Sequence, residues 1–215
     1  IHTPVNNPVK CPVYVSKSAR EYHAGGKGWY VYNGINPNDF EYSEEKDDFV
    51  LYMGMLAWYK GIVHTLEAVE KTGDNLILAG PVYDVDYHKR EIEPRIKANP
   101  RIKYIGEVGG KRRTDLLKHA KCLLFPTVCN EPFGLIMIEA MVSGTPVLAL
   151  SNGAVPEVLE RFPELICSTP EEMAEKLMRQ DFPDPKEMRS YVLGNFTRDR
   201  MARNYLNIYY ELIKA

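Results

Sequence analysis

The chain has 215 residues, of which 45% are hydrophobic and 26% are charged, and its formal net charge is −2. This composition is typical of a globular protein, and the slight negative charge argues against a general nucleic-acid or membrane-surface binder, because such proteins carry clusters of positive charge. No apolar run in the sequence approaches the roughly 20 residues of a membrane-spanning helix. The four cysteines lack the spacing of a metal site, so we expect reduced thiols in a cytoplasmic protein.

The start of the sequence predicts a strand, a helix and a second strand. The first strand covers residues 12–16, and Ser16 is a good N-cap for a helix over residues 17–24. A second strand covers residues 29–32 and is followed by turn residues. We interpret residues 1–32 as the end of a preceding domain, and a chain that does not begin with Met is consistent with a fragment or an excised domain.

Beyond a linker over residues 33–47, strands and helices alternate regularly. The expected strands cover residues 49–53, 75–79, 101–105, 122–126, 146–150 and 164–167. The helices between them cover residues 62–71, 84–98, 112–119 and 134–142. Almost continuous apolar strands are typical of a parallel sheet that helices cover on both faces. The predicted fold class is therefore α/β, with a doubly wound, Rossmann-like parallel sheet in a domain over residues 33–194.

The last part of the sequence predicts a helical extension. Further helices are expected over residues 170–180, 185–193 and 198–214. We assign residues 195–215 to a C-terminal helix whose apolar and aromatic side chains recur at helical spacing, so this face is expected to pack against another surface. These side chains are Met201, Tyr205, Ile208, Tyr209 and Leu212.

Loops rich in glycine follow the expected strands. Gly54, Gly80 and Gly106 end three strands, and the loop over residues 131–134 follows a fourth. Parallel sheets bind ligands outside the carboxyl ends of their strands, so these loops outline one crevice. The sequence lacks both the Gly-x-Gly-x-x-Gly fingerprint of dinucleotide-binding proteins and a Walker loop. Lys60, at the end of the Gly54 loop, is either a solvated lysine or a point charge for phosphate in the crevice.

The helix over residues 134–142 is unusual because Glu139 is its only polar side chain. A helix that is apolar all round should be buried, and a buried carboxylate requires a partner. Glu131 lies just ahead of this helix, where free backbone N–H groups favour anions. The two glutamates are either structural carboxylates satisfied locally or the contacts of a ligand that carries hydroxyls and phosphate.

The segment around the two glutamates resembles the Glu-x₇-Glu signature of the retaining family 4 glycosyltransferases, also described as glycosyl transferases group 1. The matching residues of the signature are Glu131-Pro132-Phe133-Gly134, Glu139-Ala140-Met141 and Gly144-Thr145-Pro146-Val147. The similarity also includes Asn33-Gly34-Ile35, Lys60-Gly61, Tyr104-Ile105-Gly106 and Gly153-Ala154-Val155-Pro156-Glu157. Motif, spacing and expected topology therefore agree over most of the chain.

The resemblance implies a two-domain enzyme of the GT-B fold, of which this chain is the C-terminal donor-binding domain. Such an enzyme transfers a hexose from a nucleotide sugar, such as UDP-glucose or GDP-mannose, to an acceptor that lies against the N-terminal domain. The resemblance implies retention through front-face attack by the acceptor, without a covalent intermediate on the protein. It implies neither a cofactor nor a metal.

The resemblance also implies roles for individual residues. The catalytic pair is Glu131, which contacts hydroxyls of the donor sugar, and Lys60, which neutralises the departing pyrophosphate. Glu139 holds the ribose, and the backbone amides of Phe133, Gly134 and Leu135 lie near the sugar and the distal phosphate. Gly54 belongs to the phosphate-side loop, and the loop that contains Gly106, Val108 and Lys111 packs against the base.

Two departures from the family pattern qualify these expectations. Family members usually carry an arginine directly after the glycine that ends the first strand, whereas Met55 follows Gly54 here, so one expected phosphate cation is missing. Most of an N-terminal domain is also missing, so we expect this chain to be inactive alone. Its expected partners are a nucleotide sugar and either the absent acceptor-binding domain or a dimer mate, with peripheral membrane association through the absent domain as a further option.

Two other functions remain open at this stage. One is a non-catalytic nucleotide-sugar-binding or assembly module, which the loss of the arginine at position 55 favours. The other is a sugar-nucleotide epimerase of the same architecture, which the transferase motif disfavours. Fold alone does not separate these functions.

Overall fold

The computed structural model describes residues 10–214, so residues 1–9 of the predicted N-terminal segment lie outside the described part. The strands are β1 (Val13–Tyr14), β2 (Trp29–Tyr30), β3 (Val50–Met53), β4 (Leu76–Ala79), β5 (Ile102–Tyr104), β6 (Cys122–Phe125), β7 (Val147–Leu150) and β8 (Ile166–Cys167). The helices are α1 (Lys17–Ala24), α2 (Ile62–Thr72), α3 (Val85–Tyr87), α4 (Glu93–Ala98), α5 (Gly110–His119), α6 (Leu135–Val142), α7 (Val155–Val158), α8 (Pro170–Arg179), α9 (Pro185–Asn195) and α10 (Arg198–Lys214). The shorter helical turns are η1 (Pro37–Asp39), η2 (Trp58–Lys60), η3 (His88–Ile92) and η4 (Pro163–Leu165).

The main sheet has six strands in the order β5-β4-β3-β6-β7-β8, and every neighbouring pair is parallel. The chain first builds outward from β3 through β4 to β5, then returns to place β6 on the other side of β3. This reversal creates a switch point between β3 and β6, which is where doubly wound sheets bind ligands. The predicted doubly wound parallel sheet is confirmed, and its strands are buried because they consist almost wholly of apolar residues.

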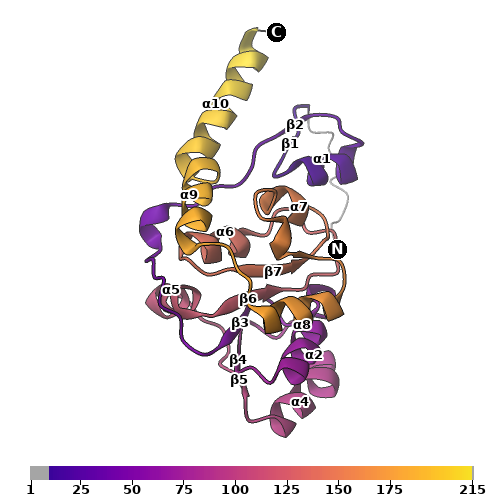
Figure 1. Ribbon diagram of the computed structural model, residues 1–215. Coiled ribbons are helices and arrows are strands. Elements are labelled where there is room, and N and C mark those ends of the chain that lie inside the picture. Colours follow the sequence, from indigo (N-terminus) through magenta and orange to yellow (C-terminus); the bar gives the residue numbers. More distant parts are fainter. Residues whose placement is uncertain (1–9, 215) are drawn as a thin grey trace.

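Helices cover the two faces of this sheet (Figure 1). Right-handed crossovers place α2 and α4 on one face and α6 on the opposite face, because the two halves of the sheet are wound in opposite directions. The returning helix α8 packs against α2, and α9 packs against α6. The core therefore lies in two layers, one on each side of the strands.

Two predicted elements of the main domain differ in kind or length from the structure, and one observed helix was not predicted. The helix expected over 84–98 contains the wide turn η3 in its middle, directly before Pro94, whose missing N–H cannot continue the regular ladder. The strand expected over 164–167 is reduced to β8, because Pro163 starts the helical turn η4. The short helix α7 was not predicted, because four residues are too few to show a helical period.

The N-terminal unit of β1, α1 and β2 forms a separate parallel pair of strands above α7 (Figure 1). Ser16 caps α1 as predicted, since its side chain accepts a hydrogen bond from the Ala19 N–H. Glu157 of α7 provides a second cap, because its carboxylate accepts bonds from the N–H groups of Lys17 at 2.9 Å and Ser18 at 2.5 Å. The Tyr32 hydroxyl donates to the same carboxylate at 2.9 Å, so one side chain fastens this unit to the main domain.

The C-terminal helix α10 runs away from the sheet (Figure 1). Of the apolar face predicted for this helix, only Ile208 is buried, and Tyr209 is exposed. The expected packing of this face is therefore realised only in part within the described chain. No helix in residues 10–214 has both the length and the apolar character that crossing a membrane requires.

We predict that Glu157→Ala loosens the N-terminal unit without unfolding the sheet. Removing the carboxylate leaves the first amides of α1 without an acceptor, and a hydrogen bond to a charged group contributes about 1.5–3 kcal/mol. Hydrogen exchange of the α1 amides should accelerate about 10- to 100-fold, while exchange in β3 and β6 stays unchanged. The control is Glu160→Ala, one turn further along the chain, and equal acceleration in both variants would contradict the assignment.

Candidate functional site

The loops after β3 and β4 touch through their backbones at the switch-point edge of the sheet. The Gly54 N–H donates to the Ala79 carbonyl at 2.9 Å, and the Gly80 N–H donates to the Gly106 carbonyl at 2.8 Å. A Cβ on Gly80 would lie 1.9 Å from the Gly54 oxygen, and Gly80 has a φ of +139°. Only glycine fits there, because any side chain would collide with backbone. The carboxyl ends of β3, β4 and β5 therefore form a continuous floor.

A cleft of about 350 Å³ lies above this floor. The loops after β3, β4 and β5 form one wall, and the start of α6 together with a side chain from α5 forms the other. The lining residues are Met53, Gly54, Met55, Ala79, Gly80, Pro81, Glu107, Val108, Arg113, Leu135, Ile136 and Glu139. The cleft thus brings together Gly54, Val108, Leu135 and Glu139, which were predicted from widely separated parts of the sequence.

Helix α6 is buried as its composition predicts, except along one line. Leu135 is 44% exposed, and it lines the cleft together with Glu139, one turn later. The buried side chains of the helix are Met137, Ile138, Ala140, Met141 and Val142. Gly134 is the N-cap in the left-handed conformation, and no described side chain caps the first turn. The amides at this helix start are therefore available to an anion.

Glu139 is paired with Arg113 of α5, whose Nη2 donates to Oε2 of the carboxylate. The side chain of Glu139 is 12% exposed and that of Arg113 is 29% exposed, so the pair lies at the inner wall of the cleft. Burial raises the pKa of the Glu139 carboxyl above its usual range, and the guanidinium opposes this shift. The expectation that a buried carboxylate has a partner is met, but the sequence did not identify Arg113 as that partner.

Glu131 is paired with Lys60, with 2.8 Å between Nζ and Oε2. The two residues are far apart in the sequence, and they meet because the turn η2 is bound to the loop after β6. The amides of Val128 and Cys129 both donate to the Tyr59 carbonyl, at 3.1 and 3.3 Å. The two residues predicted to be catalytic therefore lie in direct contact.

The backbone of Glu131 is held by the loop after β7. Ala154 donates its N–H to the Glu131 carbonyl at 2.9 Å. Gly153 has a φ of +55°, and a Cβ there would lie 2.3 Å from the Glu131 oxygen and 2.4 Å from its nitrogen. A residue larger than glycine at this position would displace Glu131.

Three other predicted site residues occupy different positions. Phe133 is buried among aromatic rings, with its ring centroid 6.1 Å from that of Tyr32 and 5.8 Å from that of Phe196, so only its backbone can face a ligand. Gly106 has a φ of +73° with open space around its Cα, beside the cleft. Lys111 is exposed and does not line the cleft, because its ammonium is bound to Asp115 at 2.8 Å.

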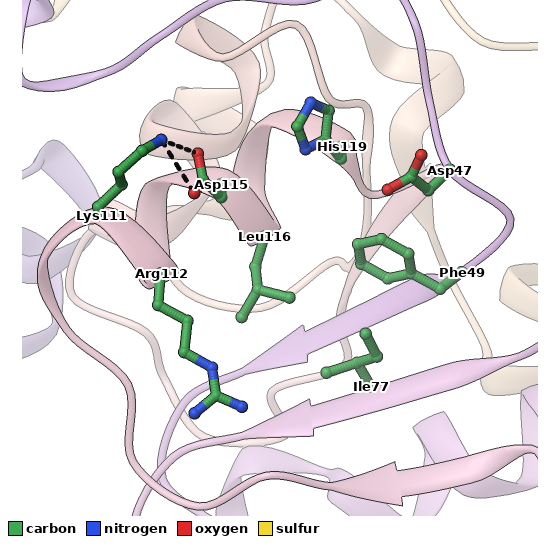
Figure 2. A pocket seen from close by; sticks show the side chains of 8 residues that line it. All are labelled: Asp47, Phe49, Ile77, Lys111, Arg112, Asp115, Leu116 and His119. Carbon is green, nitrogen blue, oxygen red and sulfur yellow. Dashed lines mark hydrogen bonds and ion pairs between the residues drawn. The ribbon is translucent and has the colours of Figure 1, made fainter.

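Lys111 instead borders a larger groove of about 610 Å³ along α5 (Figure 2). Figure 2 shows the Lys111–Asp115 pair at one end of the groove and Asp47 and His119 at the other, with Phe49, Ile77 and Leu116 in its apolar part and Arg112 beside them. This groove exists because α5 leaves part of one sheet face uncovered. It extends to residues that precede β3, away from the Gly54 and Gly80 floor, and shares no lining residue with the cleft.

Met55 lines the cleft at the position where an arginine was expected. Its carbonyl accepts a bond from the Tyr52 hydroxyl at 2.8 Å, and its sulfur accepts one from the Tyr59 hydroxyl at 3.1 Å. Among residues 10–214, no group of three or more His, Cys, Asp or Glu side chains is arranged to hold a metal ion.

Comparison with known proteins gives a consistent set of relatives. Residues 36–191 match the family model described as glycosyl transferases group 1. An uncharacterized glycosyltransferase of Methanocaldococcus jannaschii is 31% identical over 149 residues, which cover 60% of this chain and 38% of that protein. A probable sucrose-phosphate synthase of Thermosipho melanesiensis is 29% identical over 194 residues, which cover 81% of this chain and 45% of that protein.

A solved structure shows the same likeness in three dimensions. AviGT4, a glycosyltransferase involved in avilamycin A biosynthesis, superposes with a TM-score of 0.81 at 26% identity, over 94% of this chain and 63% of that chain. This chain spans less than half the length of the two curated relatives.

We predict that Glu139→Gln stabilises the fold at neutral pH. The carboxyl pKa of Glu139 is higher in the folded than in the unfolded chain, so its stabilising contribution is present below the unfolded pKa and is lost as pH rises through the folded pKa. At pH 7 the variant should therefore unfold at higher urea concentration than the unmodified chain, and the difference should shrink toward pH 4. Glu107→Gln, an exposed carboxylate of the same cleft, is the control. A less stable Glu139→Gln at pH 7 would contradict the assignment.

Proposed function

The chain belongs to the glycosyl transferases group 1 family, and on that premise we propose that its cleft binds the nucleotide-sugar donor of a retaining hexosyltransferase. The observation that carries the proposal is the start of α6, where uncapped amides and the Glu139 carboxylate face the loops after β3, β4 and β5 across one cleft. A helix start favours phosphate, and a carboxylate accepts hydrogen bonds from hydroxyls. The two features lie side by side, as a nucleoside diphosphate requires.

Each part of the donor has a proposed place. The ribose lies against Glu139, and the base packs beside Gly106 and Val108 in the loop after β5. The diphosphate lies between the first turn of α6 and Lys60. The sugar lies beyond it, beside Glu131. Lys60 and Glu131 are in direct contact, so this order assigns neighbouring side chains to neighbouring parts of the donor.

The ion pairs of the site suggest how the donor is accommodated. Lys60 is neutralised by Glu131, and Arg113 is neutralised by Glu139. An incoming diphosphate therefore meets helix amides but no unpaired side-chain cation from these pairs. We propose that Lys60 turns to the phosphate while Glu131 accepts hydroxyl groups of the sugar, so that both members of the pair regain partners.

The proposed reaction follows from this arrangement. Departure of the nucleoside diphosphate leaves an oxocarbenium-like sugar, and positive charge at Lys60 and the helix start stabilises the departing phosphate. The acceptor hydroxyl attacks from the face that the leaving group has just left and gives its proton to the departing phosphate, and attack on this face retains the configuration. Glu131 orients the sugar and forms no covalent intermediate. The group that binds the acceptor is proposed to lie outside this chain.

A second function, a nucleotide-sugar-binding module without catalysis, has one observation in its favour. Met55 lines the cleft where a second phosphate cation would help the leaving group depart. Binding requires fewer cations than transfer does, because the charge on the phosphate grows only as the sugar leaves.

Calorimetric titration tests the proposed function. The chain should bind at least one of the UDP, GDP and ADP sugars, and Glu139→Ala should weaken that binding about 10- to 100-fold, because hydrogen bonds to a charged group contribute about 1.5–3 kcal/mol. Glu164→Ala, an exposed carboxylate in the helical turn η4 that does not line the cleft, is the matched control. A correctly folded chain that binds none of these sugar nucleotides would contradict the proposal.

We further predict that Met55→Arg strengthens binding of the diphosphate. An added guanidinium at the cleft wall should raise the affinity for UDP or GDP about tenfold, because charge-assisted bonds to phosphate are strong, and the gain should decline with salt. Met55→Leu keeps the apolar volume and should bind as the unmodified chain does. If the affinity for the nucleoside without phosphate rises equally, the diphosphate does not lie beside position 55.

A further inference from the structure

Three charged side chains line the cleft, and they are Glu107, Arg113 and Glu139. Glu107 is exposed on the loop after β5, whereas Arg113 and Glu139 form an ion pair between α5 and α6. Within residues 10–214, Arg113 is the only side chain that hydrogen-bonds the Glu139 carboxylate. It binds Oε2, which leaves Oε1 for a ligand.

Arg113 reaches this carboxylate from α5, on the other side of the cleft wall. Its side chain stands between the cleft and a second cavity that the linker turn η1 and the start of α5 enclose, and it lines both. The guanidinium is planar and presents its donors in a fixed fork, so it fixes the plane of a bound carboxylate better than an ammonium does. Without it, Glu139 would be a nearly buried carboxylate without a partner, and burial would favour its protonated form.

We propose that Arg113 is a positioning residue that holds the Glu139 carboxylate toward the cleft, an inference that rests on the proposed function. Arg113 binds one carboxylate oxygen, and the other is left for the ribose hydroxyls. Arg113 itself does not touch the donor. The pair, and not Glu139 alone, then determines that the site selects a ribose over a sugar without hydroxyls.

The test compares ribonucleotides with their deoxy analogues by calorimetry. UDP and GDP identify the nucleotide that binds, and its 2′,3′-dideoxy form lacks the hydroxyls that Glu139 would read. For Arg113→Gln we expect the affinity for the ribonucleotide to fall about 10- to 100-fold, while the affinity for the dideoxy form stays within about twofold. Arg113→Lys keeps the charge and should restore part of the loss. The matched control is Arg112→Gln, which removes the neighbouring charge from the same helix on the side of the groove in Figure 2.

Two outcomes would overturn the proposal while leaving donor binding intact. If Arg113→Gln binds the ribonucleotide as well as, or better than, the unmodified chain, the arginine does not position the Glu139 carboxylate for the ribose. If both nucleotides lose affinity equally, the arginine contacts the phosphate or the base, or supports the fold.

A second readout does not depend on any nucleotide. The ¹³C signal of the Glu139 carboxyl, identified by its absence in Glu139→Gln, should titrate at higher pH in Arg113→Gln than in the unmodified chain. An unchanged titration would overturn the pairing of Arg113 with Glu139. Failure of every nucleotide to bind the unmodified chain would overturn the proposed function, and with it the role of Arg113 toward ribose.

Discussion

The burial of one carboxylate on an apolar helix is the constraint on which the arrangement of the site depends. Helix α6 must lie inside the domain because almost all of its side chains are apolar, yet Glu139 cannot lose its hydration without compensation. The fold meets both demands by turning one line of the helix toward the cleft and by bringing Arg113 to the carboxylate from α5. The topology of the sheet places the cleft, and the pairing of Glu139 with Arg113 joins α6 to α5 at its wall.

Charge balance is the second theme of the site. Both ion pairs join segments that are distant in the sequence, and each places a cation beside a carboxylate. Only the Arg113–Glu139 pair lines the cleft itself, whereas Lys60 and Glu131 lie outside its lining. A site with unpaired cations would attract any phosphate. For this site we propose that a bound anion must also donate hydrogen bonds to the two carboxylates. A nucleotide sugar can do so, because it carries hydroxyls on both sides of its diphosphate.

The sequence predicted the elements that depend on local pattern. Continuous apolar runs located the strands of the main sheet, and the Glu-x₇-Glu spacing drew attention to Glu131 and Glu139, although their roles stay predictions. Arg113 could not be selected, because three basic residues in a row look alike until the packing of α5 shows that Arg113 faces the cleft while Arg112 lies on the groove. Lys111 was assigned to the base loop by position alone, but a local partner, Asp115, holds its side chain elsewhere.

The segment from Gly153 to Glu157 works as a spacer of fixed length. At one end, Gly153 fits against the backbone of Glu131, and at the other, Glu157 caps the first turn of α1. Gly153 lies against the Glu131 backbone, and the Glu157 carboxylate bonds two consecutive amides of α1. Inserting or deleting one residue between them would therefore force the chain to give up one contact to keep the other. Ala154 and Val155 between them are fully buried. Related sequences should therefore keep the length of this segment and the small or apolar character of its buried positions.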